Sequence, residues 1–138
     1  MKKILLIMVI FLVGCSNSKF GNYTKDLPKN YNEVFAQNAY TQLSIIYPPS
    51  TSIFILSHEF NDEFGVNLYE KLKDGGYVIY QPTNEKNEET GINLGYVVDK
   101  TEKNLYRVTL FVEGKQLTKC FLIKDGKVTS FGFWTRQE

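Results

Sequence analysis

The spacing of apolar residues predicts a helix in residues 30–47. The apolar positions of this segment recur at the period of one helix face: Phe35, Ala39, Leu43 and Ile46. Asn30 and Glu33 have the spacing of a capping box, which predicts that the helix begins there. Pro48 and Pro49 lack a backbone N–H, so the helix is expected to end before them.

The next part of the chain predicts a strand, a helix and a second strand. Residues 51–57 place apolar side chains on both faces, which is typical of a central strand covered on both sides. Residues 61–63, NDE, begin a helix with acidic side chains at its positive end. Its buried face is expected to carry Phe64, Leu68 and Leu72. Gly75 and Gly76 end that helix, and residues 77–80 form the second strand. The two strands should be parallel, with a right-handed crossover.

Alternating apolar and polar residues predict four further strands between residues 92 and 135. Turns are expected around residues 102–104, at Glu113–Gly114 and at Asp125–Gly126, which is the strongest hairpin signal of the chain. The predicted fold class is α+β. It comprises an N-terminal helix, one βαβ unit and an antiparallel β-meander, which form a mixed sheet with helices packed on it. One domain should span residues 30–138.

The first residues of the chain, MKKILLIMVIFLVGC, predict an export signal. Lys2 and Lys3 precede an apolar run at residues 4–13, which is shorter than the roughly 20 residues needed to span a hydrocarbon core. The run fits the h-region of a signal peptide, and residues 12–15, LVGC, have the form of a lipobox. We predict a signal peptide at residues 1–14 and lipidation of Cys15. An ordinary signal peptide and a short N-terminal anchor helix are the alternatives.

Residues 15–29 are predicted to be a lipidated flexible tether, because the segment from Phe20 onward is polar and has no apolar period. More than one acyl chain holds a lipoprotein stably on its membrane. Ser16 follows the cysteine, whereas an Asp at that position would favour the inner membrane. We therefore expect a periplasm-facing protein of the outer membrane, and exposure on the cell surface stays open.

Charge and cysteine content narrow the function classes. The chain has 16 basic and 15 acidic residues, and removal of Lys2 and Lys3 with the signal peptide leaves it near neutrality. A near-neutral domain argues against direct nucleic-acid binding through a basic face. If Cys15 is acylated, Cys120 has no partner within the chain, so it is expected to be a small core residue. Pairing of Cys120 with another molecule is the alternative.

Candidate chemistry is sparse. His58 is the only histidine of the sequence and precedes Glu59. A His-Glu pair that belongs to a catalytic site is one interpretation, and a histidine in a loop is the interpretation that we favour. Residues 81–91 are the most polar stretch of the chain, which predicts a solvated loop. An ordered acidic site for a cation is the alternative, but the spacing does not match a calcium loop. We expect no enzyme activity, cofactor, metal site or small-molecule substrate. Trp134 and Arg136 are a candidate protein interface, since both residue types anchor interfaces. A strand-end tryptophan beside a solvated arginine is the alternative.

Several segments, taken in order, match one known family. They are the lipobox at residues 12–15, QL at 42–43, YPP at 47–49, IFIL at 53–56, the helix at 64–72 followed by GY at 76–77, LYRVTL at 105–110 and GFWTR at 132–136. In this order they resemble TrbH, a conjugal transfer lipoprotein of the mating-pair formation region of conjugative plasmids. The resemblance covers almost the whole chain and brings no catalytic residues with it. It implies a structural or assembly role in a conjugative type IV secretion apparatus.

Two functions of different classes follow. The first is a non-enzymatic lipoprotein component of a DNA-transfer channel, which contacts the membrane through acylated Cys15 and otherwise contacts channel proteins. The alternative is a periplasmic lipoprotein that binds a lipid or peptide in a chaperone-like role. An exposed apolar patch or an unpaired edge strand would favour the first, and a large apolar cavity under the helices the second.

Overall fold

The computed structural model of the chain describes residues 20–25, 27–82 and 90–138. The predicted signal peptide at residues 1–14 and the predicted lipidation site, Cys15, lie outside the described residues. Most of the polar segment at residues 81–91 lies outside them as well. No helix among the described residues is long and apolar enough to span a membrane.

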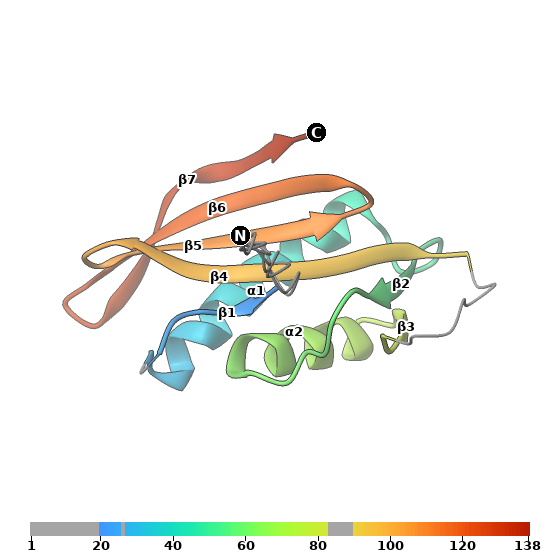
Figure 1. The fold of residues 1–138 in the computed structure, drawn as a ribbon, viewed down its shortest axis with the longest axis horizontal. Helices are drawn as coiled ribbons and strands as arrows, with labels where there is room; N and C mark the ends of the chain where they lie inside the picture. The colour runs from blue at the N-terminus through green and yellow to red at the C-terminus, as the bar shows by residue number, and fades with distance from the viewer. Residues whose placement is uncertain (1–19, 26, 83–89) are drawn as a thin grey trace, which may run out of the picture.

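Two helices and one mixed sheet make up the described domain (Figure 1). The elements are β1 (Gly21–Asn22), α1 (Lys29–Ile46), β2 (Ile53–Leu56), α2 (Glu63–Asp74), β3 (Val78–Tyr80), β4 (Ile92–Glu102), β5 (Leu105–Val112), β6 (Lys115–Lys124) and β7 (Lys127–Gln137). The sheet runs in the order β3-β2-β4-β5-β6-β7, and β1 pairs with β4. The predicted α+β class is confirmed.

The predicted βαβ unit is confirmed by β2, α2 and β3, because β2 and β3 pair in parallel. Asp62 caps α2 by accepting hydrogen bonds from the backbone N–H groups of Phe64 and Gly65. The helix ends at Gly75–Gly76, where Gly76 adopts a φ of 90° that favours glycine. The buried face of α2 is the one expected, with Phe64, Leu68 and Leu72 fully buried.

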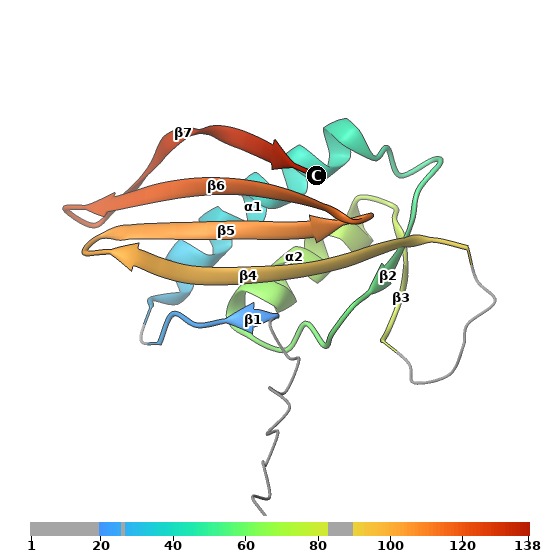
Figure 2. The ribbon, with the colours of Figure 1, turned by 45° about the horizontal axis from the view of Figure 1, so that its top comes forward.

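The antiparallel meander is also confirmed. Strands β4 to β7 pair successively in antiparallel fashion. Positive φ angles occur at both residues of the turns Glu113–Gly114 and Asp125–Gly126, as two-residue hairpin turns require. Both helices lie on the same side of the sheet (Figure 2), and the core fills the space between them and the sheet.

The start of α1 differs from the prediction. The helix begins at Lys29 with Pro28 at its N-cap and no side-chain cap, so Asn30 lies inside the helix and the predicted capping box is wrong. Pro28 has a φ of −55° and an extended ψ of 143°, and it lacks a backbone N–H, so it directly precedes the first turn without leaving a donor unpaired. The Pro28 carbonyl accepts a hydrogen bond from the Tyr31 N–H at 3.1 Å. Ile46 was expected on the buried face, but it is 39% exposed.

Strand β2 lies inside the sheet, between β3 and β4. The prediction that it is covered on both faces is wrong. Phe54 and Leu56 face the helices and are buried, whereas Ile53 and Ile55 are half-buried. The cause is the placement of both helices on one face, which leaves the other face without a second layer.

The predicted flexible tether is wrong for its described part. Gly21 and Asn22 form β1 and pair in parallel with Val97 and Val98 of β4. Phe20 packs over Gly95, where a Cβ atom would come within 2.6 Å of the phenylalanine ring. A strand of two residues has no apolar period, so the sequence pattern could not reveal that this segment belongs to the domain.

Candidate interaction surface

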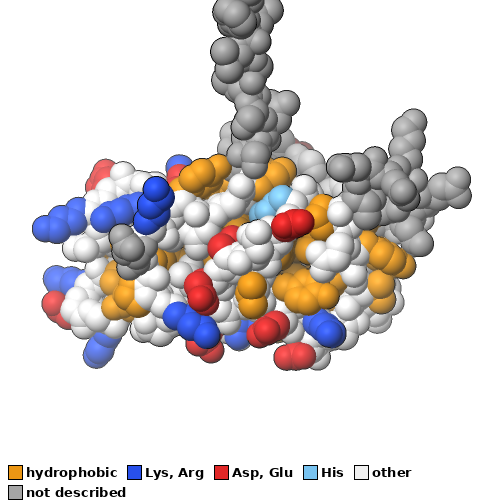
Figure 3. Space-filling model, turned by 60° about the horizontal axis from the view of Figure 1, so that its bottom comes forward, with side chains coloured by type: hydrophobic (Ala, Val, Ile, Leu, Met, Phe, Trp, Pro, Cys, Tyr) orange, Lys and Arg blue, Asp and Glu red, His pale blue; other side chains and the backbone are white. Residues whose placement is uncertain are grey.

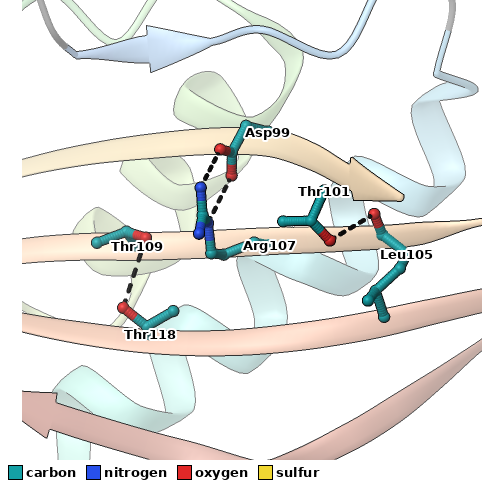
Figure 4. A network of polar contacts seen from close by, with 6 residues as sticks. All are labelled: Asp99, Thr101, Leu105, Arg107, Thr109 and Thr118. Atoms are coloured by element: carbon teal, nitrogen blue, oxygen red, sulfur yellow. Dashed lines mark hydrogen bonds and ion pairs between the residues drawn. The ribbon is translucent and has the colours of Figure 1, made fainter. Parts of the chain in front are cut away.

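The face of the sheet opposite the helices carries ordered rows of side chains (Figure 4). The strand register aligns one row across four strands: Asp99, Arg107, Cys120 and Phe131. The neighbouring row is Val97, Thr109, Thr118 and Thr135. Residues directly opposite one another on paired strands share a face of the sheet. This face therefore mixes polar and apolar side chains, and several of them line a shallow hollow between β4 and β7.

An ion pair lies on this face. Arg107 donates a hydrogen bond from Nε to Asp99 Oδ1 at 3.0 Å, and its second nitrogen bonds the other carboxylate oxygen. This hydrogen bond raises the pKa of Arg107. Because 44% of the arginine side chain is exposed, the pair adds little to stability, about 1 kcal/mol or less. Its effect is to hold two charged groups in a defined position.

Cys120 lies on the same face, between Arg107 and Phe131. It is a free thiol and half-buried, so the expectation of a small core residue is wrong. Side chains alternate between the two faces along β6, so Cys120 lies on the face away from the described helices. The next residue, Phe121, points toward the helices and is fully buried.

The outermost strand, β7, contains a bulge that sequence patterning did not reveal. Thr118 pairs with Thr135 and Cys120 pairs with Phe131, so three residues of β7 lie opposite Lys119 alone. Gly132 has a φ of 90° at this point. Bulges redirect side chains and interrupt the hydrogen-bond ladder. Here the bulge contains Phe133, which is 89% exposed.

The two predicted interface residues lie on the helix-facing side of β7 but in different settings. Trp134 is half-buried, packs against the core and lines a surface hollow of about 340 Å³ beside α1. In that hollow, Lys119 donates a hydrogen bond to Asn38 at 3.1 Å. Arg136, opposite Leu117, is exposed and forms an ion pair with Glu138. Only the tryptophan lines the hollow, so the structure does not join the two residues into one pocket.

His58 has a structural role that the sequence did not indicate. Its Nε2 accepts a hydrogen bond from the Tyr96 N–H at 3.2 Å, and its Nδ1 lies 3.1 Å from the Glu59 carbonyl oxygen. A neutral ring with its proton on Nδ1 satisfies both contacts. The ring also stacks on Phe20, with centroids 4.9 Å apart. On this side of β4, β2 pairs as far as Leu94 and β1 pairs from Val97 onward, so Tyr96 lies between the two. The imidazole supplies the hydrogen-bond acceptor that a neighbouring strand would otherwise provide.

This arrangement predicts a pH-dependent stability. Burial lowers the pKa of His58 below 6.5, against the opposing effects of Glu59 and Asp62. The unfolded chain therefore binds a proton first, and the free energy of unfolding should fall as pH drops below about 6.5. Urea unfolding at pH 7.5 and 5.5 measures this effect. His58→Ala should lose about 1–2 kcal/mol at pH 7.5 and should reduce the pH dependence. An unchanged pH dependence in the variant would contradict the assignment.

A second polar cluster joins β1 to both helices. Asn22 donates through Nδ2 to Asn32 Oδ1 of α1 at 3.0 Å, and the same nitrogen lies 3.4 Å from Asp62 Oδ1. The Tyr96 hydroxyl donates to the other oxygen of Asp62. Burial raises the pKa of Tyr96, and its hydrogen bond to Asp62 raises it further, so the hydroxyl stays protonated. This cluster holds the N-terminal strand in place.

Charge is distributed unevenly over the domain. Residues 53–80, which include α2, carry five acidic and two basic side chains, whereas residues 115–138 carry five basic and two acidic ones. Figure 3 shows basic side chains gathered at one end of the molecule and acidic ones over its middle. The end rich in basic side chains is where the β4–β5 and β6–β7 turns lie (Figure 1). The β6–β7 hairpin is therefore suited to an acidic partner.

Comparison with known proteins gives one match. The family model described as "Conjugal transfer protein TrbH" matches residues 17–138, which include every described residue of the domain. No curated protein and no solved structure matches the chain.

Proposed function

Since the chain belongs to the TrbH family of conjugal transfer proteins, we propose that it is a structural or assembly component of a conjugative type IV secretion apparatus. It acts without catalysis, anchored in the outer membrane through an acylated Cys15. The observation that carries the proposal is the sheet, of which one face is not covered by either described helix and which ends in an edge strand with exposed aromatic rings. Such a surface suits contacts with other proteins.

The position of β1 gives the proposed anchor a direction. Four residues lie between Cys15 and Phe20, the first described residue, so the five Cα–Cα steps can span at most roughly 17 Å. Strand β1 lies along one edge of β4, and β5, β6 and β7 follow on its other side. With strands spaced about 4.8 Å apart, β7 lies roughly 19 Å across the sheet from β1. The anchored edge would stay close to the membrane, and β7 would face components farther away.

The alternative, a lipoprotein that binds a lipid or peptide, requires space between the sheet and the helices. In the described domain this region is occupied by fully buried side chains, among them Phe35, Leu43, Phe54 and Tyr96. The hollow beside Trp134 lies at the surface and has mostly polar neighbours. These observations support the role in assembly over the role in ligand binding.

The anchor itself has a direct test. Cys15→Ser should abolish acylation, because the thiol that receives the lipid is removed, and the unprocessed precursor should stay in the inner membrane. Labelling cells with radioactive palmitate and separating the two membranes measures both effects. Cys120→Ser is the matched control and should incorporate label as the parent does. Equal labelling of the Cys15 variant and the parent would overturn the lipoprotein assignment.

A further inference from the structure

The strongest unexplained feature of the domain is a pair of phenylalanines on its edge strand. Phe133 is 89% exposed and Phe131 is 60% exposed, more than any other described phenylalanine. Both lie on β7, which among the described residues pairs only with β6. Burying one such ring in a partner would contribute about 1.5–3 kcal/mol. Two rings this exposed on one edge strand leave apolar surface that a partner could bury.

The bulge explains how Phe133 comes to be exposed. Residues 132–134 share Lys119 as their only opposite residue, so no side chain of β6 pairs directly with the Phe133 ring. The neighbouring Trp134 lines the hollow beside α1 and fixes the strand there. Phe133 is thus held next to a well-packed residue, and little conformational freedom would be lost when its ring binds.

The bulge also argues against one way of binding. A partner strand that adds to a sheet edge needs an uninterrupted row of backbone groups, and a bulge breaks this row. On β7 the interruption falls near the middle of the strand, at Gly132. Docking at this edge should therefore depend on side chains more than on added backbone hydrogen bonds.

We infer that Phe133, supported by Phe131, is the anchor for another protein of the transfer apparatus, which receives the ring in an apolar pocket with an acidic rim. The acidic part of the rim should face the tip of the hairpin, where Lys124 and Lys127 are exposed and lie opposite each other, roughly 13 Å along β7 from Phe131. A symmetric contact between the β6–β7 hairpins of two copies fits less well, because hairpins of the same charge would repel each other. This inference rests on the proposed function and names its contact surface.

The first experiment places a photo-crosslinking amino acid, p-benzoylphenylalanine, at position 133 of the full-length protein in donor cells. Position 45 is the control, because Ile45 on α1 is 70% exposed and lies outside β7. Crosslinked products are identified by mass spectrometry. The expected result is a product with another transfer protein from position 133 and none with that protein from position 45. A product with a second copy of this chain alone, or no product, would overturn the inference.

The second experiment measures affinity for the purified soluble domain of the transfer protein identified in this way. Phe133→Ala should weaken binding by at least about tenfold, whereas Ile45→Ala should leave it unchanged. Lys124→Glu combined with Lys127→Glu should slow association, and raising the salt from about 50 to 300 mM should reduce that difference. Unchanged affinity of the Phe133 variant would overturn the anchor, and unchanged association of the charge variant would overturn the acidic rim.

A variant that lacks residues 132–133 tests whether a folded domain without the bulge still binds the partner. It leaves Trp134 as the single residue opposite Lys119, so the β6–β7 ladder can close without a bulge. The expected result is a folded domain that no longer binds, and retained binding would contradict the role of the bulge. If this variant fails to fold, Phe133→Ala decides the question alone.

Mating assays separate this inference from the proposed function. Normal transfer by a strain that lacks the whole protein would remove the function. Loss of transfer in that strain, together with normal transfer and binding by Phe133→Ala, would remove only the anchor.

Discussion

Gly65→Ala should destabilise the domain by about 3 kcal/mol and lower its melting temperature by roughly 10 °C. Gly65 lies in the first turn of α2, directly below the hydroxyl of Tyr96. A Cβ atom there would lie 2.2 Å from that oxygen and 2.9 Å from the Cα of Phe60. The higher helix propensity of alanine offsets only about 1 kcal/mol of the resulting strain. Because Phe60 contributes backbone to the clash, turning a side chain cannot remove it.

Gly95→Ala is the matched control. The three atoms nearest to its added Cβ all belong to the ring of Phe20, the closest at 2.6 Å, and a side-chain ring can shift more easily than backbone. We expect a loss of about 1 kcal/mol or less for this variant. Thermal melts of both purified domains, followed by circular dichroism, make the comparison. If the two glycine variants melt at the same temperature, the tight packing of α2 on β4 is not as described.

The same packing shows what sequence patterning could and could not predict. The apolar period of residues 63–74 and the acidic residue before it predicted α2, its cap region and its buried face, because those signals are local. The meander was equally clear, since its turns carry Asp-Gly and Glu-Gly pairs. The start of α1 was placed wrongly, because Asn30 and Glu33 fit a capping box while Pro28 began the helix two residues earlier.

Long-range contacts account for the remaining differences. Phe20 and Asn22 lie in a polar segment, and only their contacts with His58 and Asn32 reveal that they belong to the domain. The predicted interface residues, Trp134 and Arg136, lie on the same strand as Phe133, whose ring is the most exposed of the three aromatic rings on that strand. Its exposure depends on a bulge set by the register of two strands, and Gly132 alone gave no signal of it.

The proposed anchor predicts a large loss of transfer when the protein is released from the membrane. A version that lacks residues 1–15 but is exported to the periplasm should support transfer at least about tenfold less well than the parent at equal abundance. Tethering raises the local concentration of a domain near its partners, and this version loses that effect. Restoring a lipidated cysteine at the N-terminus is the control and should recover transfer. Full activity of the untethered version would show that the anchor is dispensable.

The central claim is that this protein is needed to assemble a working transfer apparatus. Its most direct test is the mating frequency of a donor strain from which the coding sequence has been removed without affecting its neighbours. The account predicts a loss of transfer of several orders of magnitude, normal growth, and recovery when the intact protein is supplied from a second site. Unchanged mating frequency in the deletion strain, with the other transfer genes intact, would contradict the account.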